Sequence, residues 1–171
     1  MKHKFLLLYA WWIRTVLLLF PDIPFVMRFR GFLYSFGMPT SGKNFQVSAN
    51  VIIKNLENFH VGKDVYLAPF VVVNAIDDIV LENEVMIGFS SILVSGNHTR
   101  IDGSFRYGKS QTSPVNIGYG SWVGANCTIV AGGNLPLGSL LAANSVISKP
   151  LRTENAIYGG VPAKLISKLE S

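Results

Sequence analysis

The chain has 171 residues, of which 49% are hydrophobic and 15% are charged, so it can form one domain with a sizeable core, and disorder is excluded. Its net charge of +5 suits anionic ligands or a membrane surface, whereas nucleic acid is not expected as a partner, because no basic run is interleaved with aromatic residues. The single cysteine, Cys127, excludes an internal disulfide, and without a Cys-x-x-Cys pair a structural zinc site is not expected.

Residues 1–44 form the first predicted unit, a hydrophobic and amphipathic helical segment. Its opening run, MKHKFLLLYAWWIRTVLLLF, is divided by Arg14 into apolar stretches of nine and six residues, whereas a membrane-spanning helix needs about 20. No small-residue cleavage site precedes Pro21, so a signal peptide is not expected. Three positions are open for this helix: on a membrane surface, against a neighbouring subunit, or buried in the protein's own fold.

A second helical pattern covers residues 25–36. Its apolar residues follow the spacing i, i+1, i+4, i+7, i+8 and i+11, which is one stripe of an amphipathic helix. Arg28 and Arg30 lie off the stripe, and Pro39 and Gly42 end the helical region. Residues 1–36 as a whole are the predicted site of peripheral membrane contact. The stripe consists of Phe25, Val26, Phe29, Phe32, Leu33 and Phe36.

From residue 61 onward an apolar residue recurs at every sixth position, and a small or β-branched residue follows most of these four places later. A period of six is neither helical nor a simple strand alternation, but it is typical of a short strand and a turn, repeated. Three such strands close a triangular coil, and stacked coils bury a continuous core. Residues 45–152 are therefore predicted to be mainly β, with an ordinary β-sandwich as the alternative. The repeated apolar residues are Val61, Leu67, Val73, Leu81, Ile87, Leu93, Ile117, Val123, Ile129, Leu135, Leu141 and Ile147.

Two interruptions break this repeat. The first is the pair Ile79 and Val80, which we expect a corner to absorb. The second is a loop over residues 99–116 that begins directly after His98 and carries polar residues suited to lining a cleft. Loops of this length in a compact domain are usually functional or disordered.

The last predicted unit, residues 153–171, follows the end of the repeat. Its segment PAKLISKLES indicates a short C-terminal helix, with Leu165, Ile166 and Leu169 on one side. Pro162 suits the first turn of such a helix.

Three segments, IGYGSWVGANCTIV, LPLGSLLAANSVISK and YGGVPAKLI, together resemble the closing part of the hexapeptide-repeat acyltransferases, and the resemblance covers roughly residues 45–167. It implies a left-handed parallel β-helix, within the branch of sugar and polysaccharide O-acetyltransferases. It also implies a homotrimer with active sites between subunits, and acetyl-CoA as the acyl donor.

The histidine at the break is the candidate catalytic residue. A sugar hydroxyl must lose its proton as it attacks a thioester, and imidazole is suited to this at neutral pH. In the family a histidine at this break is the catalytic base, which maps to His98. The segment GNHTRIDGS also resembles the branch that acetylates antibiotics, so Asn97 is expected to contact the acceptor. Arg100, Asp102 and Tyr107 are further acceptor-binding candidates.

The resemblance also suggests a donor site. In the family the pantetheine arm of CoA lies in a groove between two β-helices, against small residues and backbone amides. A backbone N–H near Ala125 is then the candidate oxyanion donor. For the lysines and the tryptophan, solvated or corner-packing side chains remain the alternative. The matching positions are Trp122, Ala125, Ala143 and Ser148, with Lys149 and Lys164 for the phosphates.

These inferences indicate an acetyl-CoA-dependent O-acetyltransferase that transfers acetyl directly, in a ternary complex, to a sugar hydroxyl of a bacterial surface polysaccharide (lipopolysaccharide or capsule) or its precursor. We expect a cytoplasmic enzyme with peripheral contact at the inner face of the cytoplasmic membrane. No metal is expected, because His3, His60 and His98 are widely spaced, and His60 is assigned to a corner. The alternatives are another acceptor, such as an antibiotic, an amino sugar or serine, and a non-enzymatic β-helical scaffold.

Overall fold

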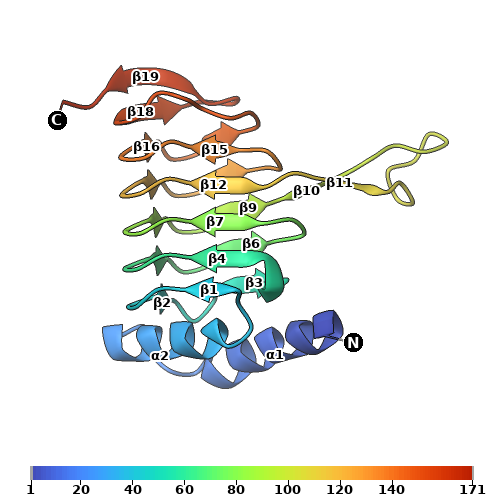
Figure 1. The fold of residues 1–171 in the computed structure, drawn as a ribbon, viewed down its shortest axis with the longest axis vertical. Coiled ribbons are helices and arrows are strands. Elements are labelled where there is room, and N and C mark those ends of the chain that lie inside the picture. The colour runs from blue at the N-terminus through green and yellow to red at the C-terminus, as the bar shows by residue number, and fades with distance from the viewer. Residues whose placement is uncertain (1, 171) are drawn as a thin grey trace.

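The computed structural model of the protein, which describes residues 2–170, is a stack of triangular coils standing on two helices (Figure 1). The helices are α1 (Lys2–Leu17) and α2 (Pro24–Ser35), and they lie across the base of the stack. A single 3-10 turn, η1 (Leu56–Asn58), follows the first coil. The C-terminal strand closes the opposite end.

Three sheets form the faces of the coil stack, and within each face consecutive coils pair in parallel. Sheet A contains β1 (Thr40–Ser41), β4 (Phe59–Val61), β7 (Ile79–Leu81), β12 (Val115–Ile117) and β15 (Asn134–Leu135). Sheet B contains β2 (Gln46–Val47), β5 (Tyr66–Leu67), β8 (Met86–Ile87), β13 (Trp122–Val123), β16 (Leu140–Leu141), β18 (Ala156–Gly159) and β19 (Lys164–Lys168). Sheet C contains β3 (Ile52–Lys54), β6 (Val72–Asn74), β9 (Ile92–Val94), β14 (Thr128–Ile129) and β17 (Val146–Ile147).

The interior of the coils follows the six-residue repeat. None of the twelve repeated apolar residues is more than 3% exposed, which confirms the β-solenoid and excludes the sandwich. The small residues turn the corners, where they satisfy backbone groups: the Ser91 hydroxyl donates to the carbonyl of Gly124 and accepts from the amide of Cys127. A Cβ on Gly88 would lie 2.7 Å from the carbonyl carbon of Gly124, so only glycine permits this spacing between coils.

The first interruption is not in a corner, contrary to the prediction. Ile79 and Val80 lie in β7, where Ile79 is fully buried and in register with Phe59 below and Val115 above. The alternation of a strand places Ile79 on the same inward side as Leu81, so the extra residues of this coil move into the preceding corner, residues 75–78.

Helix α1 packs on the first coil through one of its sides. Leu6, Ala10, Ile13 and Leu17 are buried, so of the three open positions the structure shows the one against the protein's own fold. The opposite side of the helix stays exposed. Among the residues that the structure describes, neither helix combines the length and apolar character needed to cross a bilayer.

Helix α2 has the predicted stripe, but the stripe faces away from the coils. Its buried residues are Met27, Arg30, Gly31 and Tyr34. Arg30, which the spacing places off the stripe, is only 2% exposed. Each phenylalanine of the stripe is at least 44% exposed.

The burial of Arg30 has a physical cause at the end of α1. The last carbonyls of a helix lack partners within it, and a guanidinium supplies five donors. Arg30 donates to the carbonyls of Leu17 and Phe20 and to Asp22, at 3.2, 2.6 and 2.6 Å. The arginine therefore joins the two helices and holds α2 with its phenylalanines facing away from the coils.

The predicted C-terminal helix is wrong. Residues 164–168 form strand β19, which pairs antiparallel with β18, the last parallel strand of sheet B. An uncovered β18 would present unpaired backbone groups at the end of the stack, and β19 satisfies them. Leu165 and Ile166 are 48% and 64% exposed, so a helical apolar stripe finds no surface to cover here.

Candidate active site

His98 lies on an arm that leaves the coils at the edge between sheets A and C (Figure 1). The arm is a hairpin of β10 (Gly96–His98) and β11 (Ser110–Thr112), in which His98 is opposite Ser110. It begins nearer the coil than the predicted loop, and residues 115–116 already belong to β12. The root is held by Ser95, whose hydroxyl accepts from the amide of Asp77 and donates to the carbonyl of the same residue.

The side chains of Asn97 and His98 are both exposed. Within residues 2–170 the structure gives the imidazole of His98 no side-chain hydrogen-bond partner. The backbone of His98 is held by strand pairing, while both ring nitrogens stay accessible to a substrate. Such an arrangement positions a base without engaging its nitrogens.

The outer part of the arm is built around a tight turn. Ile101 and Ser104 pair across it, and the two residues between them, Asp102 and Gly103, have φ of +47° and +81°. Positive φ at both central positions is the requirement of a type I′ turn, for which Asp-Gly is a favoured sequence. Asp102 therefore has a local role in shaping the arm, whatever it contacts.

The remaining acceptor-binding candidates flank this turn. Arg100 is exposed, and Tyr107 is 81% exposed. The guanidinium of Arg106 lies 5.5 Å from the centre of the Tyr107 ring, close enough for a cation–π contact. The hydroxyl of Thr99 donates to the carbonyl of Lys109 and ties the two sides of the arm together.

The predicted donor residues lie in four places on the coils. Trp122 is on β13 with its side chain outward on sheet B, 47% exposed. Ala125 and Ala143 stack at the edge between sheets B and C, where the amide of Asn144 donates to the carbonyl of Ala125 at 2.9 Å. The other three donor candidates are all exposed: Ser148 and Lys149 follow β17 at the edge between sheets A and C, and Lys164 begins β19.

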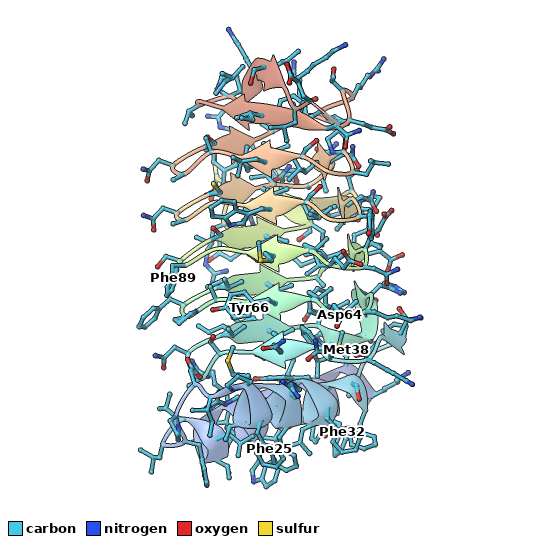
Figure 2. The ribbon with its side chains drawn as sticks, turned by 90° about the vertical axis from the view of Figure 1, so that its left-hand side faces the viewer. Phe25, Phe32, Met38, Asp64, Tyr66 and Phe89 are labelled. Atoms are coloured by element: carbon cyan, nitrogen blue, oxygen red, sulfur yellow. The ribbon has the colours of Figure 1, made fainter. Side chains whose placement is uncertain are left out.

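One chain does not bring His98 together with Trp122. The arm leaves the edge between sheets A and C, whereas Trp122 lies on sheet B, the face opposite that edge (Figures 1 and 2). Trp122 and the arm of a single chain are therefore on opposite sides of the coil stack, whereas Ser148 and Lys149 lie at the same edge as the arm.

An apolar groove beside Trp122 was not predicted from the sequence. It has a volume of about 250 Å³, and Met86 and Phe89, which line it, are 46% and 56% exposed. Tyr66 belongs to the same face, which Figure 2 shows with Phe89 at its edge. The available signal was the position before each buried repeat residue: parallel register stacks Tyr66, Met86 and Trp122 on the outside.

Cys127 is not a nucleophile. Its side chain is fully buried, and its thiol lies 3.2 Å from the carbonyl oxygen of Ala142. Burial raises the pKa of the Cys127 thiol, which lowers its thiolate fraction. The residue fills a corner of the core.

The other histidines pair with neighbouring side chains. His60 is on strand β4 and not at a corner, with its ring nitrogens 3.2 Å from the hydroxyl of Thr40 and 3.3 Å from Asp78. His3 pairs with Glu57. Over residues 2–170, three or more His, Cys, Asp or Glu side chains nowhere gather as a metal site would require.

Comparison with known proteins identifies relatives with a common chemistry. No model of a protein family matches the sequence. A protein of Escherichia coli K12, WbbJ, is 26% identical over 161 residues, covering 84% of this chain and 78% of its own; its name proposes an O-acetyl transferase of lipopolysaccharide biosynthesis. The galactoside O-acetyltransferase of the same organism is 26% identical over 132 residues, covering 76% of this chain and 64% of its own.

Solved structures show the same fold. A galactoside acetyltransferase in complex with coenzyme A has a TM-score of 0.83 at 21% identity, covering 98% of this chain and 82% of the other. A hexapeptide-repeat acetyltransferase from Vibrio cholerae, complexed with acetyl coenzyme A, has a TM-score of 0.82 at 19% identity, covering 98% and 89%. The chain therefore has the β-solenoid fold of the hexapeptide-repeat acetyltransferases, and its curated relatives carry acetyltransferase names.

Proposed function

We propose that the protein is an acetyl-CoA-dependent O-acetyltransferase that acts on a sugar hydroxyl. The observation that carries the proposal is the arm: the coils of an acetyltransferase fold open at one point, and an exposed histidine stands on the hairpin that emerges. The names of the relatives support the chemistry, and WbbJ favours a surface polysaccharide or its precursor as the acceptor.

In the proposed mechanism His98 accepts the proton of the acceptor hydroxyl as its oxygen attacks the thioester carbonyl. A new carbon–oxygen bond forms, the carbon–sulfur bond breaks, and the proton taken by the imidazole is available to the departing CoA thiolate. A backbone N–H near Ala125 stabilises the developing oxyanion. Transfer is direct, within a ternary complex.

The other site residues bind the two substrates. The small side chains of Ala125 and Ala143 let the thin pantetheine arm approach the backbone, with Trp122 beside it, while Ser148 contributes from the edge between sheets A and C. Lys149 and Lys164 attract the phosphates of CoA as point charges. The acceptor lies against the arm of the protein, where Asn97, Arg100, Asp102 and Tyr107 bind it.

A homotrimer completes this site. Because the arm and sheet B of one chain face in opposite directions, His98 of one copy serves the donor groove of a neighbouring copy. The exposed apolar residues of the groove support this arrangement, since a neighbouring arm shields them from water. Contact with the inner face of the cytoplasmic membrane, through residues 1–36, places the enzyme near lipid-linked acceptors.

Complementation between two inactive variants tests both the activity and the shared site. His98→Ala removes the base, and Ala143→Trp fills the donor groove; each trimer alone is expected to be inactive when CoA thiol release is followed with a panel of sugar acceptors. Trimers reassembled from a mixture contain interfaces where both residues are wild type, so we expect activity to return to a measurable fraction. A mixture as inactive as its components, with mixed trimers present by native mass spectrometry, would contradict the shared site.

A further inference from the structure

The base of the coil stack carries an aromatic surface that the proposed catalysis does not use. The four phenylalanines of α2, Phe25, Phe29, Phe32 and Phe36, recur at i, i+4, i+7 and i+11 and are 75%, 44%, 57% and 68% exposed. They lie opposite the buried side of the helix, and Figure 2 shows Phe25 and Phe32 projecting away from the coils. Phe32 and Phe36 contact each other edge to face, with ring centres 4.9 Å apart.

Helix α1 and the connection to α2 extend this surface. Leu8 and Trp12 are 62% and 50% exposed on the side of α1 away from the coils, and Leu19 in the connection is 92% exposed. We call the outward side of the two helices the basal face. Contiguous apolar surface of this kind marks an interaction site, and tryptophan is enriched where proteins meet a membrane interface.

The positive charge of the protein is concentrated around the same face. Residues 1–54 contain seven Lys and Arg against one Asp, whereas the rest of the chain has eight against nine acidic residues. Asp22, the single acidic residue of this segment, is paired with the buried Arg30 at 2.6 Å, and Glu57, which follows the segment in η1, pairs with His3 of α1. The other basic residues of this segment are therefore not neutralised by a nearby carboxylate within it.

Two grooves beside the helices combine these cations with aromatic side chains. Arg28 and Lys43 line a groove of about 380 Å³ between α2 and the first coil, next to Phe32. Arg14 and Lys54 line another, of about 370 Å³, between α1 and β3, next to Trp11. A pair of cations beside an apolar surface matches a phosphate with a hydrocarbon chain attached.

We infer that the basal face docks on a bilayer rich in anionic phospholipid, with both helices lying flat in the headgroup region. The charge pattern selects this occupant, because a second copy placed base to base would bring two cationic surfaces together. An anionic lipid surface is complementary to both the aromatic side chains and the cations. The deep burial of one side of each helix means that the coils present this face without any rearrangement.

Docking in this way sets the height of the proposed active site, an extension that depends on the proposed function. The arm leaves the third coil, two spacings of about 4.8 Å above the first, and the helices add about 10 Å. His98 would therefore stand about 20 Å above the outward side of the helices, which lies in the headgroup region. That distance suits a glycan carried on a lipid, whose outer sugars extend from the membrane, as the acceptor.

Vesicle flotation with the full-length protein tests the docking. We expect the wild type to float with vesicles of phosphatidylcholine and 30% phosphatidylglycerol, and to bind phosphatidylcholine alone at least tenfold more weakly. The double variant Phe29→Asp/Phe32→Asp should lose binding to both at least tenfold, while Arg28→Glu/Lys43→Glu should lose mainly the preference for phosphatidylglycerol. Phe70→Asp is the matched control, because Phe70 is 58% exposed but lies at a corner of the second coil, between β5 and β6, and it should bind like the wild type.

The outcomes separate docking from catalysis. Each variant is also assayed for its thermal midpoint and for acetyl transfer to a soluble acceptor, neither of which should change. A wild type that fails to float on the anionic vesicles would overturn the inference. So would a wild type whose particle mass doubles in solution and falls to the trimer mass in Phe29→Asp/Phe32→Asp, since the occupant would then be a second copy. Flotation without acetyl transfer would leave the docking intact and contradict only the proposed function.

Discussion

The coils and the two N-terminal helices are both rich in apolar residues, but they direct them in opposite ways. The twelve repeat residues of the coils are at most 3% exposed, while the four phenylalanines of α2 are at least 44% exposed. A closed triangular coil has only one interior, so the six-residue spacing alone decides which residues are buried. A helix at the end of a stack has two usable sides, and the one that turns inward depends on its neighbours. The coils thus bury their apolar side chains, while the base and the arm leave theirs exposed.

The substitution with the largest expected effect on activity lies where the arm leaves the coils. His98→Ala should lower kcat by about a thousandfold, within the range of general-base catalysis, without moving the urea midpoint, because the side chain is exposed. Ser110→Ala, at the opposite position of the hairpin, is the control and should retain activity. The comparison fails if His98→Ala remains fully active in the thiol-release assay.

Stability should depend on the coils far more than on the base. Leu93→Ala creates a cavity in a fully buried position and should lower the free energy of unfolding by about 2–5 kcal/mol. Phe32→Ala should change it by less than about 0.5 kcal/mol, as for exposed positions. Urea unfolding at one fixed protein concentration measures both. An equal loss in the two variants would mean that α2 buries its phenylalanines elsewhere in the assembly.

The orientation of helix α2 at the base of the coil stack depends on the contacts of one buried arginine, Arg30. Arg30→Met removes a donor from Asp22 and from the carbonyls of Leu17, Phe20 and Val47, and should cost about 1–3 kcal/mol of unfolding free energy. Arg28→Met, on the exposed side of the same helix, is the matched control and should be nearly neutral. Equal effects of the two would refute the role given to Arg30 in orienting α2.

The smallest effect is expected from exposed charges on the coils. Lys149→Ala and Lys164→Ala should each raise the KM for acetyl-CoA by about two- to fivefold with kcat unchanged, since an exposed charge pair contributes less than about 1 kcal/mol. Initial rates at varied acetyl-CoA and at two salt concentrations measure this. If neither substitution changes the KM for acetyl-CoA, these lysines do not belong to the donor site.

Sequence reasoning failed where a segment depended on its neighbours. The apolar spacing in residues 164–169 suggested a helix, but the unpaired edge of β18 makes this segment a strand. Ile79 was assigned to a corner, yet alternation with Leu81 places it in the core. At the candidate site, Met86 and Phe89 were not predicted, because only the inward-facing residues of the repeat were considered. The roles of His98 and of the donor residues stay predictions.

The sequence alone determined the solenoid, because a repeat of six residues with small residues at the corners closes into one form of coil and places its own core. It also located the opening of that coil at a histidine. Only the tertiary structure decided that the phenylalanines of α2 face outward, because Arg30 on the other side of the helix binds Asp22 and the carbonyls of Leu17 and Phe20. It alone placed the arm and the Trp122 groove on opposite sides of the stack. The apolar pattern within either segment does not indicate which face of the coil that segment occupies.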